Sequence, residues 1–239
     1  MTRKADIAPV VYAIGDVHGE AARLKRLHGL IFERHQILWP NHPIQIVHLG
    51  DYVDRGADSA GVIELLLELE QRSDVVSVML QGNHEALMSD GLANINPTAY
   101  ETWLVNGGEQ TLNSYRARGY KSVPERHRLW IQGLPKIHVE QDLKLIFVHA
   151  GIHPIDYPND REEVYLWTRS QRFFDVEKWE NNALEGWTVV HGHTPTEDSY
   201  PDNCASRSRR INVDTGAVFG GRLTSAIFAP GEEVQFIYA

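Results

Sequence analysis

The sequence predicts an α/β fold on three observations. The first third of the chain alternates short apolar runs with segments of helical pattern, in the order β–α–β–α–β, which is typical of parallel strand pairing. The apolar runs are short and rich in valine and isoleucine, as β-strands are. The last quarter, residues 211–239, contains strand-like runs separated by glycine and proline, which indicates hairpins or a meander.

Eight runs have the composition of β-strands. They cover residues 10–14, 44–49, 75–80, 143–148, 188–190, 211–213, 223–228 and 234–238. The first three are almost wholly apolar, as expected of strands buried on both faces. Helices are predicted at 21–38 and at 62–69, and Asp58 or Ser59 can cap the second one.

Residues 85–135 interrupt this rhythm with a mainly helical pattern. Thr98 and Glu101 have the spacing of a capping box before an apolar run that begins at Trp103. Because this insertion follows one of the polar motifs described below, we expect it to form a helical cap over the site. Residues 195–210 are polar and turn-rich and predict an exposed loop. No long linker divides the chain, so we expect one domain over residues 1–239.

Composition restricts the class of protein. The chain has 239 residues, enough for a large core, and a net charge of −9, which argues against non-specific binding to nucleic acid or to an anionic membrane. Its one cysteine, Cys204, rules out an internal disulfide bond and fits a reducing compartment. The N-terminal residues show no signal-peptide pattern, and no apolar run reaches about 18 residues. A soluble cytoplasmic protein with an undetermined oligomeric state is therefore expected.

Five short polar motifs each close one of the apolar runs. They are GDVHG (15–19), GDYVDRG (50–56), GNHE (82–85), HAG (149–151) and HGHT (191–194). In parallel α/β sheets, ligands bind beyond the carboxyl ends of the strands, where the first three motifs lie. The motifs therefore bring carboxylate, imidazole and amide groups to one edge of a sheet.

These side chains are suited to holding two metal ions. Asp16 and His18 lie two residues apart past a strand end and can bind one ion, and the carboxylate of Asp51 can bridge two. A second ion would then be completed by one amide and two imidazoles, from Asn83, His149 and His193. Oxygen and imidazole ligands without thiolate favour Mn, with Fe or Zn as alternatives. Two such ions lower the pKa of a bridging water and produce the attacking hydroxide.

The remaining polar residues of the motifs predict an acid and two phosphate-binding groups. His84 follows Asn83 and can donate a proton to the leaving oxygen, while Asp54 can orient its ring. Arg55 offers a bidentate fork for phosphate oxygens, and Arg169 offers a second one. Asn83 is also a candidate for contacting phosphate.

Single motifs also allow structural interpretations. GDVHG alone is a weak signal, because tight turns after strands often contain Gly-Asp. Residues 204–210 match the Cys-x5-Arg pattern of cysteine phosphatases, but no glycine lies within them and no strand is predicted just before them. His48 is expected to be a core residue, His191 a strand-end residue and His153 a surface residue. The other histidines, at 28, 35, 42, 127 and 138, are expected not to bind metal.

Taken in order, the five motifs resemble those of the phosphoprotein phosphatase family of metallophosphoesterases. The segments 103–108 (WLVNGG) and 212–219 (NVDTGAVF) resemble its bacterial and phage branch, which includes the bacteriophage lambda phosphatase. The resemblance covers residues 10–230 or so. It implies a calcineurin-like αββα sandwich, in which helices flank two mixed sheets.

The resemblance also implies roles for individual residues. One metal would be held by Asp16, His18 and Asp51, and the other by Asp51, Asn83, His149 and His193. It selects His193 over His191 and matches Arg169 to the branch's second phosphate-binding arginine. It implies hydrolysis of phosphoserine or phosphothreonine in a protein or peptide, with some activity on phosphotyrosine.

Three rival functions remain, of which a nuclease of the wider metallophosphoesterase class is favoured least. Symmetrical hydrolysis of diadenosine tetraphosphate would use the same scaffold, although that branch usually carries alanine where this chain has Asp54. A non-catalytic binding module with the same fold would usually lack a ligand or the acid, whereas here every expected position is filled.

Overall fold

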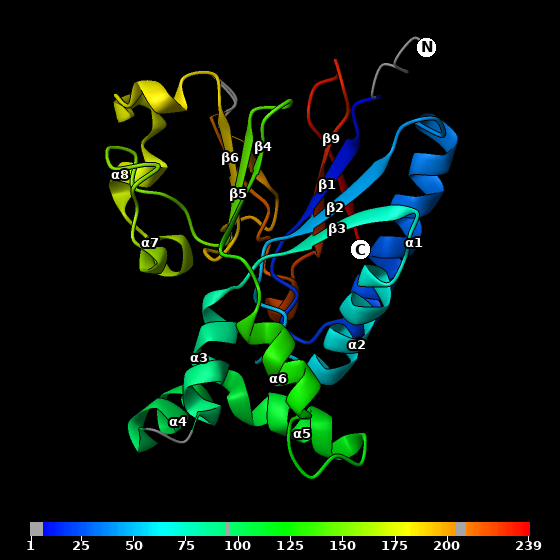
Figure 1. Cartoon of the computed structure of the whole chain (residues 1–239), viewed down its shortest axis with the longest axis vertical. Coiled ribbons are helices and arrows are strands. Elements are labelled where there is room, and N and C mark those ends of the chain that lie inside the picture. Colours follow the sequence, from blue (N-terminus) through cyan, green and yellow to red (C-terminus); the bar gives the residue numbers. More distant parts are fainter. Residues whose placement is uncertain (1–6, 94–95, 204–208) are drawn as a thin grey trace, which may run out of the picture.

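Two five-stranded sheets form the centre of the molecule (Figure 1). This computed structural model describes residues 7–93, 96–203 and 209–239. The first sheet has the order β10-β9-β1-β2-β3, formed by Gln235–Tyr238, Thr224–Phe228, Val10–Ile14, Ile44–His48 and Val75–Met79. The second has the order β4-β5-β6-β8-β7, formed by Ile137–Glu140, Leu145–Val148, Thr188–His191, Arg210–Asn212 and Asp202–Asn203.

Both sheets are mixed, with parallel strands at the centre. In the first sheet β1, β2 and β3 are parallel, as the β–α–β alternation predicted, while β9 is antiparallel to β1 and β10. In the second sheet β5, β6 and β8 are parallel, and β4 and β7 pair antiparallel at the two edges. The central parallel strands therefore deliver their carboxyl ends, and the residues that follow, to the same region.

The two sheets pack face to face, with helices on their outer sides. Alternate residues of β1 divide between the two layers: Val11 and Ala13 pack with Phe147 of β5, whereas Tyr12 packs against the helices. Helices α1 (Ala21–Leu38) and α2 (Ser59–Glu70) cover the first sheet. The second is covered by the short helices α7, α8, η2 and η3, formed by Glu162–Trp167, Gln171–Phe174, Val176–Lys178 and Asn182–Leu184. The predicted sandwich of two mixed sheets between helices is confirmed.

The segment predicted as a helical insertion is helical. It contains α3, α4, η1, α5 and α6, formed by Asn83–Leu92, Pro97–Trp103, Leu104–Gly108, Glu109–Ala117 and Glu125–Gln132. Figure 1 shows these helices together beyond one end of the strands. The predicted capping box at Thr98 is wrong, because the cap of α4 is Asn96, whose side chain accepts from the backbone N–H of Thr98, and Pro97 occupies the first turn.

Several strand predictions need correction. Strand β3 is an edge strand with Val76 exposed, so its apolar run does not mean burial on both faces. The loop predicted at 195–210 contains β7, and β4 lies at 137–140 where no strand was predicted. The strand at Arg210–Asn212 joins the second sheet, so only β9 and β10 form the late hairpin. Asp58 caps α2 as predicted, accepting from the Gly61 N–H. No helix within the described ranges has the length and apolar character needed to cross a membrane.

Candidate metal centre and active site

Asp51 is shared between two groups of possible metal ligands. Its Oδ2 lies 3.3 Å from His18 Nε2, and its Oδ1 lies 3.4 Å from His149 Nε2. The first group joins Asp51 to His18 and His84, and the second joins it to His149 and His193. In each group the ligand atoms lie within 4.8 Å of one another and all the residues are buried. Asp51 thus has the place of a bridging carboxylate.

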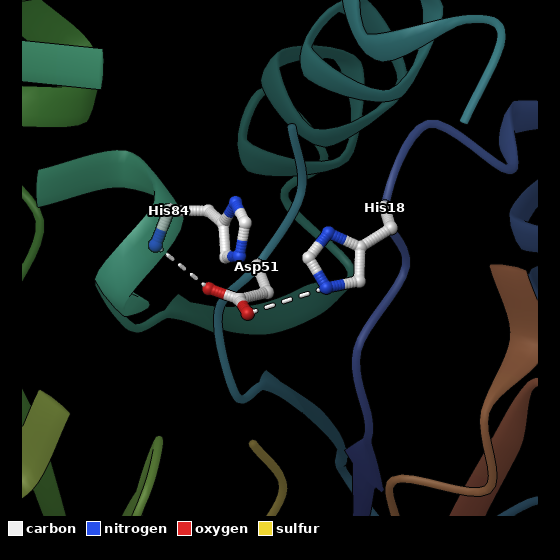
Figure 2. A group of neighbouring side chains, drawn as sticks. All are labelled: His18, Asp51 and His84. Carbon is white, nitrogen blue, oxygen red and sulfur yellow. Dashed lines mark hydrogen bonds and ion pairs between the residues drawn. The ribbon is translucent and has the colours of Figure 1, made fainter. Parts of the chain in front are cut away.

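Figure 2 shows how the first group is oriented: His18 and His84 approach Asp51 from different segments. The ring Nδ1–H of His18 donates to the carbonyl of Val53 at 2.8 Å, which orients the ring with its Nε2 toward Asp51. The backbone N–H of His84 donates to Asp51 Oδ1 at 3.0 Å. His18 Nε2 and Asp51 Oδ2 therefore face each other at 3.3 Å, in positions from which both could bind one cation.

The second group places hydrogen-bond acceptor atoms in contact with one another, with too few protons between them to form hydrogen bonds at every contact. His149 donates from Nδ1 to the carbonyl of Leu49 at 2.9 Å, so its Nε2 carries a lone pair, and this lone pair lies 2.8 Å from Asn83 Oδ1. Nδ1 of His193 lies 2.8 Å from the same Asn83 oxygen and 3.2 Å from His149 Nε2. One proton on His193 cannot satisfy all three contacts, whereas a divalent cation can. The donor set therefore fits a metal ion.

Charge states in the buried site favour cation binding. Burial lowers the pKa of His149, and it lowers the pKa of His193 to about 2, so both rings are neutral and can act as ligands. Burial by itself would raise the pKa of Asp51, but the imidazoles of His149, His84 and His18 hold that pKa well below its ordinary value. A carboxylate that stays ionised beside the neutral rings of His149 and His193 attracts cations.

Asp16 lies beside this set, at the backbone of His193. Both of its carboxylate oxygens lie 3.2 Å from the backbone N–H of His193, and it is not in either ligand group. Burial raises its pKa well above the ordinary value, and the nearby carboxylates of Asp214 and Asp51 raise it further. Asp214, which lies in the segment 212–219 and was given no role from the sequence, is itself buried, and burial raises its pKa to about 6. Metal binding by Asp16 remains a prediction.

Backbone contacts between motifs hold the ligands in position. A Cβ added at Gly56 would lie 1.9 Å from the carbonyl oxygen of His18, so the first two motifs touch backbone to backbone. Glu85, to which the motif analysis gave no role, accepts the N–H groups of Asp51, Tyr52 and Gly82 at 2.8–2.9 Å. Asp51 itself has a left-handed φ of 54°, a strained conformation that these bonds stabilise.

His84 is paired with Asp54, as predicted for an acid and its orienting carboxylate. The Nδ1 of His84 lies 2.8 Å from Asp54 Oδ2, and both side chains are buried. The insertion fixes Asp54 from the other side: Trp103 Nε1–H donates to its two oxygens at 2.9 and 3.1 Å, and the Thr111 hydroxyl donates to Oδ1 at 2.7 Å. Trp103 and Thr111 were missed as functional residues, since no local signal connects them to a carboxylate about 50 residues away.

Each of the two predicted arginines contacts a different ligand group. Arg55 donates from Nη1 to Nε2 of His18 at 2.7 Å, and Arg169 donates from Nη2 to the carbonyl of His193 at 3.3 Å. The backbone N–H of Arg55 donates to the carbonyl of Gly107 in the insertion. Both guanidinium groups are therefore within reach of an anion placed at the ligand groups.

Histidines predicted not to bind metal lie apart from the two groups. His191 is buried one residue from the glycine of its motif, and its Nε2 accepts from Arg210 Nη1 at 3.0 Å. Burial, together with that guanidinium, lowers the pKa of His191 to about 3. His48 is a core residue whose Nε2 lies 3.2 Å from that of His28. The match to the Cys-x5-Arg pattern begins at Cys204, and residues 204–208 lie outside the described ranges.

Together, these groups have the parts needed for phosphoester hydrolysis. Two adjoining cation sites, a buried imidazole–carboxylate pair and two guanidinium groups converge at one end of the sandwich. Cations and guanidinium groups stabilise the charge of a transferring phosphoryl group, and an imidazole can protonate the leaving oxygen.

Comparisons with known proteins agree with this chemistry. The family model described as calcineurin-like phosphoesterase matches residues 9–221. A relative named bis(5'-nucleosyl)-tetraphosphatase PrpE (asymmetrical), from Bacillus cereus strain AH820, is 28% identical over 237 residues, covering 93% of this chain and 92% of the relative.

Solved structures show the same fold. One described as a putative diadenosine tetraphosphatase has a TM-score of 0.61 at 23% identity, over 98% of this chain and 95% of the other. A serine/threonine protein phosphatase from Saccharomyces cerevisiae has a TM-score of 0.57 at 15% identity, over 99% and 81%. The predicted calcineurin-like fold is confirmed, whereas the names do not single out the phage-like branch.

Proposed function

The chain belongs to the calcineurin-like phosphoesterase family, and we propose that it hydrolyses bis(5'-nucleosyl) tetraphosphates. It is a metal-dependent phosphoesterase by family and fold. The substrate class is supported by a relative of that name which aligns with nearly the whole of both chains. This favours the rival of the protein phosphatase prediction. Symmetrical cleavage of the tetraphosphate gains no support, because the relative is named asymmetrical.

Two divalent ions, expected to be Mn, would be held on one side by Asp16, His18 and Asp51. On the other side the ligands would be Asp51, Asn83, His149 and His193. When bound, the ions supply charge neutralisation at the phosphate and an acidified water. The crowding of acceptor atoms around Asn83 and His149 is the observation that carries this assignment.

The chain's own residues perform the remaining steps. Arg55 and Arg169 bind the non-bridging phosphate oxygens and orient the phosphorus for in-line attack. His84 gives the proton on its ring to the oxygen that leaves, and Asp54 holds the ring in the orientation that this transfer needs. Burial of His84 and Asp54 excludes water from the pair.

Hydrolysis of phosphoserine or phosphothreonine remains a second candidate, favoured by one observation. The His84–Asp54 pair is buried and fully oriented, which suits an alkoxide leaving group that must be protonated. A leaving polyphosphate is a much weaker base and needs that proton less. The same site can therefore serve both classes, with different dependence on His84.

A rate comparison distinguishes the two candidates. The purified protein with Mn(II) is assayed for kcat/KM on diadenosine tetraphosphate and on a phosphoserine peptide, and the nucleotide products are separated by chromatography. We expect the higher kcat/KM on the dinucleotide, with AMP and ATP as products. A higher value on the peptide would reject the proposal, and ADP as the only product would restore symmetrical cleavage.

A further inference from the structure

Two exposed aromatic rings lie beside the metal centre. Trp167, at the end of α7, is 44% exposed, and Phe219, at the end of the short helix η4 (Ala217–Phe219), is 65% exposed. The Trp167 ring lies edge-on to that of His193, with centroids 6.4 Å apart. The guanidinium carbon of Arg55 lies 5.6 Å from the centroid of Phe219. Exposed aromatic rings beside phosphate-binding groups are suited to stacking on the planar part of a ligand.

The two rings belong to opposite halves of the site. Phe219 neighbours Arg55, which bonds to His18 of the first ligand group. Trp167 neighbours His193 of the second group, two residues before Arg169 in the chain. Asp51 is the residue that the two groups share. A phosphate chain that spans the two ligand groups over Asp51 would therefore have Phe219 near one of its ends and Trp167 near the other.

Both rings are carried by constrained backbone. Helix η4 lies between Gly216 and Gly220, both in the left-handed region with φ of 70° and 92°. Helix α7 is tied to the loop after His149, since the backbone N–H of Ala150 donates to the Tyr165 carbonyl at 2.7 Å. A preformed surface loses little conformational entropy when a ligand stacks on it.

We infer that Trp167 and Phe219 are stacking surfaces for the nucleobases of the substrate. The inference rests on the proposed function and extends it, because a bis(5'-nucleosyl) substrate carries an aromatic base at each end of its phosphate chain. Every base has a π-face, so such surfaces bind nucleotides with little preference among bases. The metal centre and the arginines hold the phosphates, and the rings distinguish nucleotides from other phosphate esters.

The test uses two ligands that differ only in the base. Binding of AMP and of ribose 5-phosphate to the Mn(II)-loaded protein is measured by calorimetry, which needs no turnover. We expect AMP to bind more tightly by about tenfold or more, the usual contribution of one stacked base. The double variant Trp167→Ala/Phe219→Ala should lose this preference while ribose 5-phosphate binds as before. Trp167→Phe and Phe219→Tyr should keep it, whereas Trp167→Leu/Phe219→Leu should not.

Tyr120→Ala is the matched control, since Tyr120 is also an exposed aromatic residue but packs beside Tyr115 in the insertion. It should retain the preference for AMP. Equal binding of AMP and ribose 5-phosphate by the unaltered protein, or an unchanged preference in either double variant, would overturn the inference even if diadenosine tetraphosphate is hydrolysed. A base preference that the variants abolish, in a protein that does not cleave the dinucleotide, would instead reject the proposed function and keep the stacking surfaces.

Discussion

The predicted metal ligands and the predicted acid pair, His84 and Asp54, are held in place by different parts of the chain. Five of the six predicted ligands, here called the metal-ligand set (His18, Asp51, Asn83, His149 and His193), follow strand ends, and two of their rings are oriented by backbone carbonyls of neighbouring motifs or strands. Asp54 is instead fixed by Trp103 and Thr111, two side chains of the helical insertion. Metal binding should therefore depend on the sandwich and proton donation on the insertion, and variants can separate the two.

The largest effect is expected from Asp51→Asn. An amide cannot replace a carboxylate shared by two ligand groups, so metal content should fall at both sites. Removing one group that stabilises a transition state usually lowers kcat by about 10²–10³-fold, and the loss here should be larger. His18→Ala is the comparison, since it should empty mainly one site. Elemental analysis that finds one ion per chain at saturating Mn, with full activity, would reject the shared carboxylate.

His84→Asn should come next and should leave metal content unchanged. We expect turnover on an alkyl phosphate to fall by about 10²–10⁴-fold, the usual range for an acid–base group. The loss should be smaller on p-nitrophenyl phosphate, whose leaving group barely needs a proton. Equal losses on the two substrates would show that the variant damages the site as a whole.

The sequence was enough to predict that the side chains of the metal-ligand set lie together, because its signals are local, while their binding of metal remains a prediction. Each strand is a short apolar run, and each predicted ligand lies in the polar motif that closes one, so parallel pairing was enough to bring them together. The cap of α2 at Asp58 was found for the same reason. The choice of His193 over His191 came from family resemblance, and the structure is consistent with it, since His191 bonds to Arg210 away from the ligand groups.

Features that depend on long-range contacts could not be predicted. Nothing near Trp103 or Thr111 in sequence indicates a bond to Asp54, although a buried indole N–H generally needs an acceptor. Glu85 was visible as a motif residue, but its bonds to the backbone of Asp51 and Tyr52 require the fold. Strand β7, two residues long, has too little pattern to detect.

Thr111→Val tests whether the insertion controls proton donation. Valine keeps the shape of threonine but removes the hydroxyl that donates to Asp54 Oδ1 and accepts from the Asp54 N–H. We expect about a 10–100-fold loss on an alkyl phosphate, as for other outer partners of functional groups, with metal content unchanged. The loss should be smaller on p-nitrophenyl phosphate, as for His84→Asn.

Tyr115→Phe is the control for this prediction. It also removes a buried hydroxyl from the insertion, but that hydroxyl pairs with His127 Nδ1 at 2.9 Å and does not contact Asp54. It should leave the ratio of rates on the two substrates unchanged. If both variants lower all rates alike, the insertion contributes only stability, and the separation between the two parts of the site is lost.

The smallest effect is expected from Arg169→Ala, on the metal-ligand side of the comparison. Arg169 is exposed and reaches the site through one bond of 3.3 Å to the His193 carbonyl, so its contribution to phosphate binding should be worth about 2–10-fold in kcat/KM. Inhibition by inorganic phosphate should weaken in parallel, and Arg169→Lys should restore only part of it, because an ammonium group cannot form a bidentate fork. Arg172→Ala is the matched control: Arg172 is three residues further along and also exposed, and its backbone carbonyl accepts from Trp179. A variant at Arg169 with normal phosphate inhibition would leave Arg55 as the guanidinium group that binds phosphate, and the second ligand group would then act without an arginine of its own.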